Sequence, residues 1–133
     1  MKNLLLLSVS IVLTACTLSP TGTLTGSTQR YETHNDILNT WVGKSEQELQ
    51  THWGVPVRTQ SESNNTKIIY FRSQNPYIYM ACINAFQIEK GVVTKWGTRG
   101  CPVRDNKKDY KLVHKDAPVP QPTLDISGIN LGS

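Results

Sequence analysis

Apolar residues dominate the first fifteen positions of the chain and then give way to a polar stretch. Residues 4–7 are all leucine, the apolar run continues to Leu13 with only Ser8 and Ser10 interrupting it, and Lys2 precedes it. Such a run is too short to span a bilayer, which takes about 20 residues. A positive start, a short apolar run and a small residue before the cut are typical of an export signal. We therefore predict a signal peptide over residues 1–15.

The spacing of apolar residues next predicts two short helices between residues 33 and 54. Either Thr33 or Asn35 can cap the first helix. Its apolar face, at the i, i+1, i+4, i+5 spacing of a helix, consists of Ile37, Leu38, Trp41 and Val42. The second helix opens on the capping box Ser45-Glu46-Gln47-Glu48. Leu49 and Trp53, four residues apart, form its inner face.

A β-rich segment follows, in which we predict three strands. Residues 67–72, which are mainly β-branched and aromatic, form the first strand, residues 77–88 the second and residues 92–96 the third. Glu89-Lys90-Gly91 connects the last two strands, because glycine readily adopts the positive φ of a hairpin turn. The polar stretch 61–66, with Asn64-Asn65, is predicted to be a turn that leads into the sheet. The predicted fold class is α+β, with two short N-terminal helices packed on a three-stranded antiparallel β-meander.

Both ends of the chain are predicted to lie outside this domain. Residues 16–30 are rich in Ser, Thr and Gly, and we expect them to be a flexible tether. Residues 31–115 form the α+β domain, in which residues 109–113 are a candidate edge strand. Residues 116–133 are rich in proline, glycine and serine, and we expect a disordered tail. Such a tail is either passive or a peptide that docks on a partner.

The distribution of charge narrows the classes of partner that the protein can bind. The 14 basic and 10 acidic residues give a net charge of +4, and loss of Lys2 with the signal leaves +3. Because these charges are dispersed rather than gathered on one basic face, nucleic acid is not expected as a partner.

Two cysteines, Cys82 and Cys101, remain as a pair in the folded part. In an exported protein we predict that they form a disulfide at the open end of the hairpin. With Glu89 opposite Val92, the two cysteines are two residues out of register, so they are either diagonal neighbours or are brought together by a bulge near Gly97 or Gly100. A free, redox-active pair is the alternative.

Little in the sequence points to catalysis or to a bound metal. His34, His52 and His114 are not at ligand spacing from one another, and no nucleophile accompanies them. We therefore predict a non-enzymatic protein without a metal or another cofactor. Amphipathic aromatic side chains are the remaining candidates for partner binding, and they are Tyr77, Tyr79 and Trp96.

The last residues of the predicted signal, together with Cys16, indicate a more specific type of export signal. Leu13-Thr14-Ala15-Cys16 resembles the lipobox of bacterial lipoproteins. The resemblance implies cleavage before Cys16, a diacylglyceryl group on its sulfur and an acyl chain such as palmitate on its amine, which together anchor stably. Thr17 stands where an aspartate would imply retention in the inner membrane, so the resemblance implies the outer membrane. The alternative is an ordinary secretory signal that ends near a cysteine.

Residues 35–97 resemble the SmpA/OmlA (BamE-like) family of small outer-membrane lipoproteins. The matching motifs are Gly43-Lys44-Ser45, Leu49 with Trp53-Gly54-Val55-Pro56, and Phe86 with Gly91-Val92-Val93. The family has a helical segment followed by an antiparallel sheet, and its members work in envelope complexes. The pair Cys82 and Cys101 and the long segment after it depart from the family pattern.

The function that the resemblance implies is that of a lipid-anchored protein on the periplasmic side of the outer membrane. Such a protein is a non-enzymatic scaffold or accessory subunit of an envelope complex, of the outer-membrane assembly or integrity type. One alternative is an accessory lipoprotein of a secretion or conjugation apparatus, which would use the Pro-rich tail as its partner segment. The other is a periplasmic inhibitor or ligand-binding lipoprotein with an aromatic cleft near Tyr77, Tyr79 and Trp96.

Overall fold

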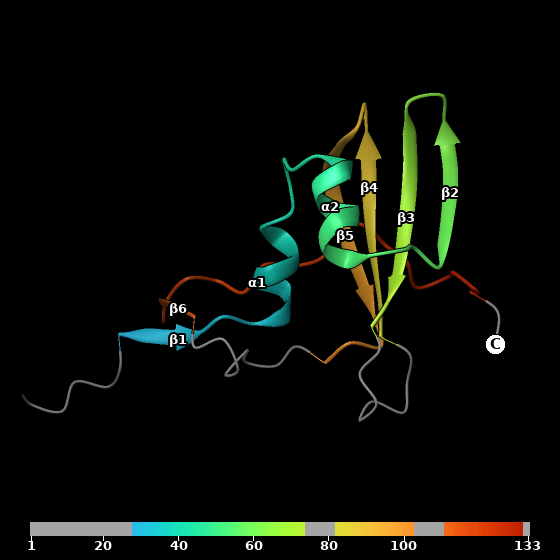
Figure 1. Ribbon diagram of the computed structural model, residues 1–133. Helices are drawn as coiled ribbons and strands as arrows, with labels where there is room; N and C mark the ends of the chain where they lie inside the picture. Colours follow the sequence, from blue (N-terminus) through green and yellow to red (C-terminus); the bar gives the residue numbers. More distant parts are fainter. Residues whose placement is uncertain (1–27, 74–81, 103–110, 132–133) are drawn as a thin grey trace, which may run out of the picture.

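Two antiparallel sheets and two short helices make up the fold in the computed structural model, which describes residues 28–73, 82–102 and 111–131 (Figure 1). In chain order the elements are β1 (Gln29–Tyr31), α1 (His34–Asn39), α2 (Glu46–Trp53), β2 (Arg58–Ser63), β3 (Thr66–Arg72), β4 (Ile83–Glu89), β5 (Val92–Arg99) and β6 (Leu112–His114). The larger sheet has the order β2-β3-β4-β5, and β1 pairs with β6 in a separate two-stranded sheet.

The predicted three-stranded meander is wrong, because the main sheet has four strands and a second sheet lies beside it. The missed strand is β2, whose second half, residues 61–63, lies in the stretch that was predicted to be a turn. All but one of its residues are exposed, so it lacks the alternation of apolar and polar residues that signals a strand. Pairing with β3 places it in the sheet, and the turn itself is confined to Asn64-Asn65.

Both helices begin at capping boxes, and the second is the one that the sequence predicted. Ser45 Oγ accepts from the Glu48 amide at 3.2 Å, and the Glu48 carboxylate accepts from the Ser45 amide at 2.9 Å. Thr33 and Asp36 make the same exchange at the start of α1. This helix ends earlier than its apolar pattern predicted, at Asn39, and Val42 lies beyond it with 45% of its surface exposed.

A first core lies between the helices and one face of the main sheet (Figure 1). Aromatic rings fill its centre: the Trp53 ring centroid is 5.4 Å from that of Phe86 and 5.8 Å from that of Phe71. The remaining buried members are aliphatic or tryptophan side chains from the helical region and from β3, β4 and β5: Leu38, Trp41, Leu49, Ile69, Ile88, Val93 and Trp96.

The C-terminal segment covers the opposite face of the same sheet (Figure 1). Leu124, Ile126, Ile129 and Leu131 pack there on a second cluster, which contains Ile68, Tyr70, Ile83 and Ala85. Residues 123 and 124 also donate backbone hydrogen bonds to the carbonyl of Trp96. This packing corrects the expectation of a disordered tail for residues 116–131. The apolar residues of the segment are separated by aspartate, serine, glycine and asparagine, so no sustained periodic pattern revealed their role.

The small sheet joins residues that are far apart in the chain. Its register pairs Gln29 with His114 and Tyr31 with Leu112. The Arg30 side chain is held by a bidentate ion pair with Asp36, at 2.7 and 3.0 Å. Residues 29 and 30, which were predicted to be part of the tether, are therefore in a strand of the domain.

Candidate functional site

Three of the predicted site residues lie outside the residues that the structure describes. They are the lipidation candidate Cys16 and the aromatic candidates Tyr77 and Tyr79. No helix in the described ranges is both long and apolar enough to cross a membrane. The remaining predicted residues are Cys82, Cys101 and Trp96, and all three are described.

Trp96 is a core residue rather than a surface for binding. Its side chain has 0% exposure within the first core. Its indole N–H donates to Asn39 Oδ1 at 3.0 Å, so its polar atom is also satisfied internally. This corrects the prediction that Trp96 binds a partner: β5 places it opposite Phe86, on the face that the helices cover.

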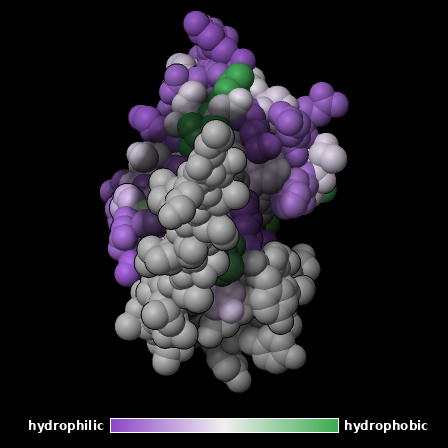
Figure 2. All heavy atoms as spheres, turned by 90° about the vertical axis from the view of Figure 1, so that its left-hand side faces the viewer, coloured by the Kyte–Doolittle hydropathy of each residue, from purple (hydrophilic) through white to green (hydrophobic). Residues whose placement is uncertain are grey.

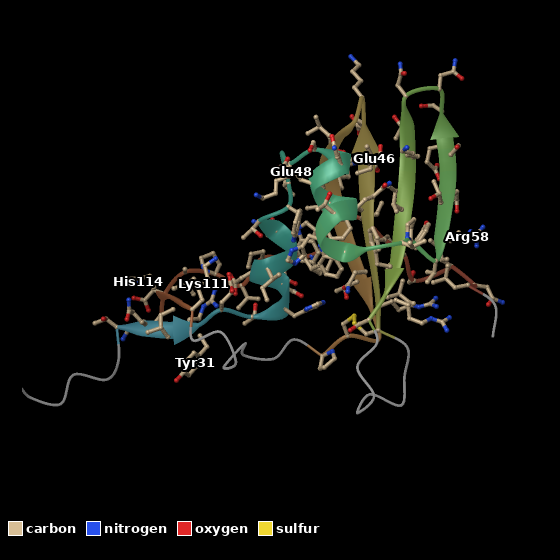
Figure 3. The ribbon with its side chains drawn as sticks, in the orientation of Figure 1. Tyr31, Glu46, Glu48, Arg58, Lys111 and His114 are labelled. Carbon is tan, nitrogen blue, oxygen red and sulfur yellow. A yellow bond between two sulfur atoms is a disulfide. The ribbon has the colours of Figure 1, made fainter. Side chains whose placement is uncertain are left out.

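Cys82 and Cys101 form the predicted disulfide, with their Cα atoms 4.5 Å apart. The bond ties the start of β4 to the end of β5, at the lower end of the sheet in Figure 3. The bulge near Gly97 or Gly100, one of the two predicted ways to align the cysteines, is wrong in position. Ile88 pairs with Val93 whereas Gln87 pairs with Lys95, so the extra residue is Thr94, next to the hairpin turn.

A buried polar cluster surrounds this disulfide. Asn84 has 0% exposure, and its Oδ1 lies 2.9 Å from His34 Nε2 and accepts from the Thr98 hydroxyl at 3.1 Å. The same oxygen is 3.5 Å from Cys101 Sγ. Helix α1 supplies the imidazole, β4 the amide and β5 the hydroxyl. Sequence reasoning missed this cluster, because His34 and Asn84 are 50 residues apart and only the fold brings them together.

The two edges of the main sheet differ in how well they are covered. At β5, the Gly43 amide donates to the Val93 carbonyl and the Val93 amide donates to the Lys44 carbonyl, while the C-terminal segment bonds to Trp96. At the other edge, β2 has no strand beyond it among the described residues (Figure 1). Unpaired strand edges readily accept another strand, so β2 is the open edge of this sheet.

Two exposed valines precede the open edge. Val55 is 90% exposed and Val57 is 52% exposed, the highest exposures among the large apolar side chains of the described residues. Arg58, the first residue of β2, extends toward the C-terminal segment (Figure 3) and donates to the Asn130 carbonyl at 3.1 Å. An apolar pair and a strand edge are thus adjacent, which is an arrangement suited to binding an extended segment of another protein.

Where described atoms are visible on the side of the molecule that carries α1, they are mainly hydrophilic, with only small hydrophobic areas between them (Figure 2). The carboxylates of α2, Glu46 and Glu48, already interact with other residues of the protein. Glu46 pairs with Lys67 at 2.8 Å, and hydrogen bonds from Ser45 lower the pKa of Glu48.

No family model, curated protein or solved structure matches this chain.

Proposed function

We propose that this protein is a lipid-anchored, non-enzymatic scaffold or accessory subunit of a protein complex in the bacterial envelope. A lipid on Cys16 holds it at the outer membrane, facing the periplasm. The support for this location is the short apolar N-terminal run and the lipobox-like Leu13-Thr14-Ala15-Cys16. The Cys82–Cys101 disulfide is consistent with an oxidising compartment. The SmpA/OmlA resemblance supports the class of complex, an outer-membrane assembly or integrity machine.

The observation that carries the partner-binding role is the open edge at β2 with Val55 and Val57 beside it. A partner segment that runs along β2 gains backbone hydrogen bonds, and apolar side chains in that segment gain contact with the two valines. Burial of an exposed valine contributes on the order of 1–2 kcal/mol, so two such contacts are significant for a weak, membrane-concentrated interaction. Lipid anchoring raises the local concentration of the domain and strengthens binding to any partner in the same membrane.

The alternatives receive less support from the positions of their key residues. Trp96 cannot line the predicted aromatic cleft, because its side chain is buried. The segment proposed as a docking peptide for a secretion apparatus has its apolar residues from Leu124 onward packed on the sheet. The scaffold role is therefore the preferred proposal.

Photo-crosslinking in the envelope tests the proposed surface. A photoreactive amino acid is placed at position 57 and, as a matched control, at position 42, because Val42 is a similarly exposed valine away from β2. We expect a discrete crosslinked partner from position 57 and none, or a different one, from position 42. The Val55→Asp/Val57→Asp variant is expected to reduce recovery of that partner by roughly tenfold or more, which corresponds to about 1.4 kcal/mol or more.

Equal crosslinking at both positions would contradict the assignment of the β2 edge. Identification of the partner by mass spectrometry separates the classes of complex. Barrel-assembly components support the first proposal, secretion components support the alternative apparatus, and a soluble hydrolase supports an inhibitor. Absence of any envelope protein partner contradicts the scaffold role.

A further inference from the structure

The disulfide end of the main sheet gathers three side chains of the kinds that bind metals. A ring nitrogen of His34 and the sulfurs of Cys82 and Cys101 all lie within 4.8 Å of one another. Cys82 is buried, while His34 and Cys101 are half-buried. Within the described ranges no other three histidine, cysteine or acidic side chains converge in this way. The sulfurs bond to each other in this state, so they are not free to bind a metal.

The three candidate ligand atoms are surrounded by buried, hydrogen-bonded side chains. The fully buried Asn84 amide lies among them, with Oδ1 2.9 Å from His34 Nε2 and Nδ2 3.9 Å from Cys82 Sγ. Thr98 also donates to Asn84 Oδ1, at 3.1 Å. When His34 turns toward a cation, Thr98 still satisfies the Asn84 oxygen, so that no buried acceptor is left without a partner.

We propose that reduction of the Cys82–Cys101 disulfide converts this cluster into a binding site for a thiophilic d10 cation such as Zn²⁺. Cys82 and Cys101 supply two thiolates and His34 supplies a neutral ring nitrogen. These are the ligand types that zinc prefers, and three protein ligands leave a fourth position open to water or to another molecule. The site is independent of the β2 edge and lies at the far end of β4 and β5 from the hairpin turn.

The chemistry balances in two steps. A dithiol reductant transfers two electrons and two protons, so the S–S bond breaks, two thiols form and the reductant becomes a disulfide. Zn²⁺ then replaces the two thiol protons, which are released to solvent as two Zn–S bonds form. Bond lengths of about 2.3 Å to sulfur and about 2.0 Å to nitrogen put tetrahedral ligand atoms roughly 3.3–3.8 Å apart. To complete the site, the two sulfurs, which are bonded in this state, have to separate to about 3.8 Å. The His34 nitrogen, which lies within 4.8 Å of both sulfurs, has to approach each of them to about 3.5 Å.

Zinc titration of the full chain, purified in detergent, tests this proposal. The oxidised chain is compared with the chain reduced by a phosphine, which competes for zinc less than a dithiol. Competition with a chromophoric chelator gives the affinity, and native mass spectrometry gives the stoichiometry. We expect one Zn²⁺ per reduced chain, none per oxidised chain, and release of about two protons on binding.

Two variants make the test specific. His34→Gln is expected to weaken zinc binding by at least the roughly 10- to 100-fold that loss of a supporting group costs a metal site. His52→Gln removes an exposed histidine elsewhere and should leave the affinity unchanged. Circular dichroism of the reduced chain checks that the fold persists without the bridge.

Three outcomes would overturn the proposal. The first is a reduced chain, folded or unfolded, that binds no zinc. The second is equal zinc binding by the Cys82→Ser/Cys101→Ser variant, which would point to ligands elsewhere. The third is an equal affinity of His34→Gln and the unmodified chain, which would remove His34 from the site.

Discussion

The Asp36 side chain lies at the start of the helical region and is held there by several hydrogen bonds. Its carboxylate accepts from both terminal nitrogens of Arg30, at 2.7 and 3.0 Å, and from the Thr33 amide at 2.8 Å. It thereby joins β1 to α1 and completes the cap of that helix. These hydrogen bonds, led by those from Arg30, lower the pKa of Asp36 from 3.8 to about 2.

This pKa predicts how stability depends on pH. Because the folded-state pKa is below the unfolded value, the stabilisation by Asp36 is fully present above about pH 4 and is lost as the pH falls toward 2. The side chain is only 13% exposed, and the shift corresponds to a stabilisation on the order of 2 kcal/mol. Asp36→Asn should therefore lower the free energy of unfolding by about 1–2 kcal/mol at pH 7.

Urea unfolding at pH 7, 4 and 2 measures this effect. The unmodified chain should lose more stability between pH 4 and pH 2 than the Asp36→Asn variant does. Asp125→Asn is the control, because Asp125 is an exposed aspartate whose lowered pKa results from hydrogen bonds with Ser127, and its effect should be small. An identical acid response in the Asp36→Asn variant and the unmodified chain would contradict this role.

At the scale of elements, Gly97 determines how the C-terminal segment lies on the sheet. A Cβ at this position would lie 2.3 Å from the Leu124 carbonyl oxygen. The contact is with backbone, so neither partner can move aside by rotating a side chain. The segment approaches β5 this closely because the amides of residues 123 and 124 bond to the Trp96 carbonyl.

Gly97→Ala should therefore displace the C-terminal segment and expose the second core. We expect a loss of about 1–3 kcal/mol in stability, the usual cost of overpacking, and faster hydrogen exchange and proteolysis between residues 120 and 131. Gly128→Ala is a matched control in the same segment, because nothing lies within 4 Å of its added Cβ. Equal protection of the segment in both variants would show that the close contact is not what holds it.

The elements that could be predicted from the sequence are those determined by short-range pattern. The capping box of α2 and the turn at Asn64-Asn65 depend on a few adjacent residues, and β3 is a compact β-branched and aromatic run. The strand β2 could not be found in this way, because it is polar on both faces and owes its conformation to pairing with β3. The docked C-terminal segment was missed for a similar reason, since its apolar residues follow no period.

The candidate sites also divide into those that the sequence predicts and those that it does not. The disulfide was predictable because the predicted export signal and the hairpin register together constrain the two cysteines. The cluster of His34, Asn84 and Thr98 was not, because those residues come from three elements that meet only in the folded chain. Trp96 shows the opposite error, in which a tryptophan assigned to the surface lies in the core because it is opposite Phe86 on the face that the helices cover.

At the scale of the whole molecule, the proposed lipid at Cys16 determines where the domain works. Cys16→Ser should abolish incorporation of labelled palmitate and move the protein from the outer-membrane fraction to a different fraction. The Cys82→Ser/Cys101→Ser variant is the matched control, because it loses two cysteines but keeps the anchor, and it should stay in the membrane fraction. A Cys16→Ser variant that still sediments with the outer membrane would contradict the anchoring proposal.

The pairing of β1 with β6 and the packing of residues 124–131 on the sheet have a consequence for biogenesis. On the proposed export route, a chain that emerges from a translocation channel N-terminus first exposes β1 long before β6 arrives, and the sheet face stays uncovered until Leu131 has passed. Contacts between residues that are distant in the chain slow folding. The incomplete chain therefore exposes aggregation-prone apolar surface for longer than a domain whose contacts are mostly between nearby residues. In the proposed periplasmic location, molecules truncated before residue 131 should therefore be substrates for chaperones and proteases rather than stable shorter forms.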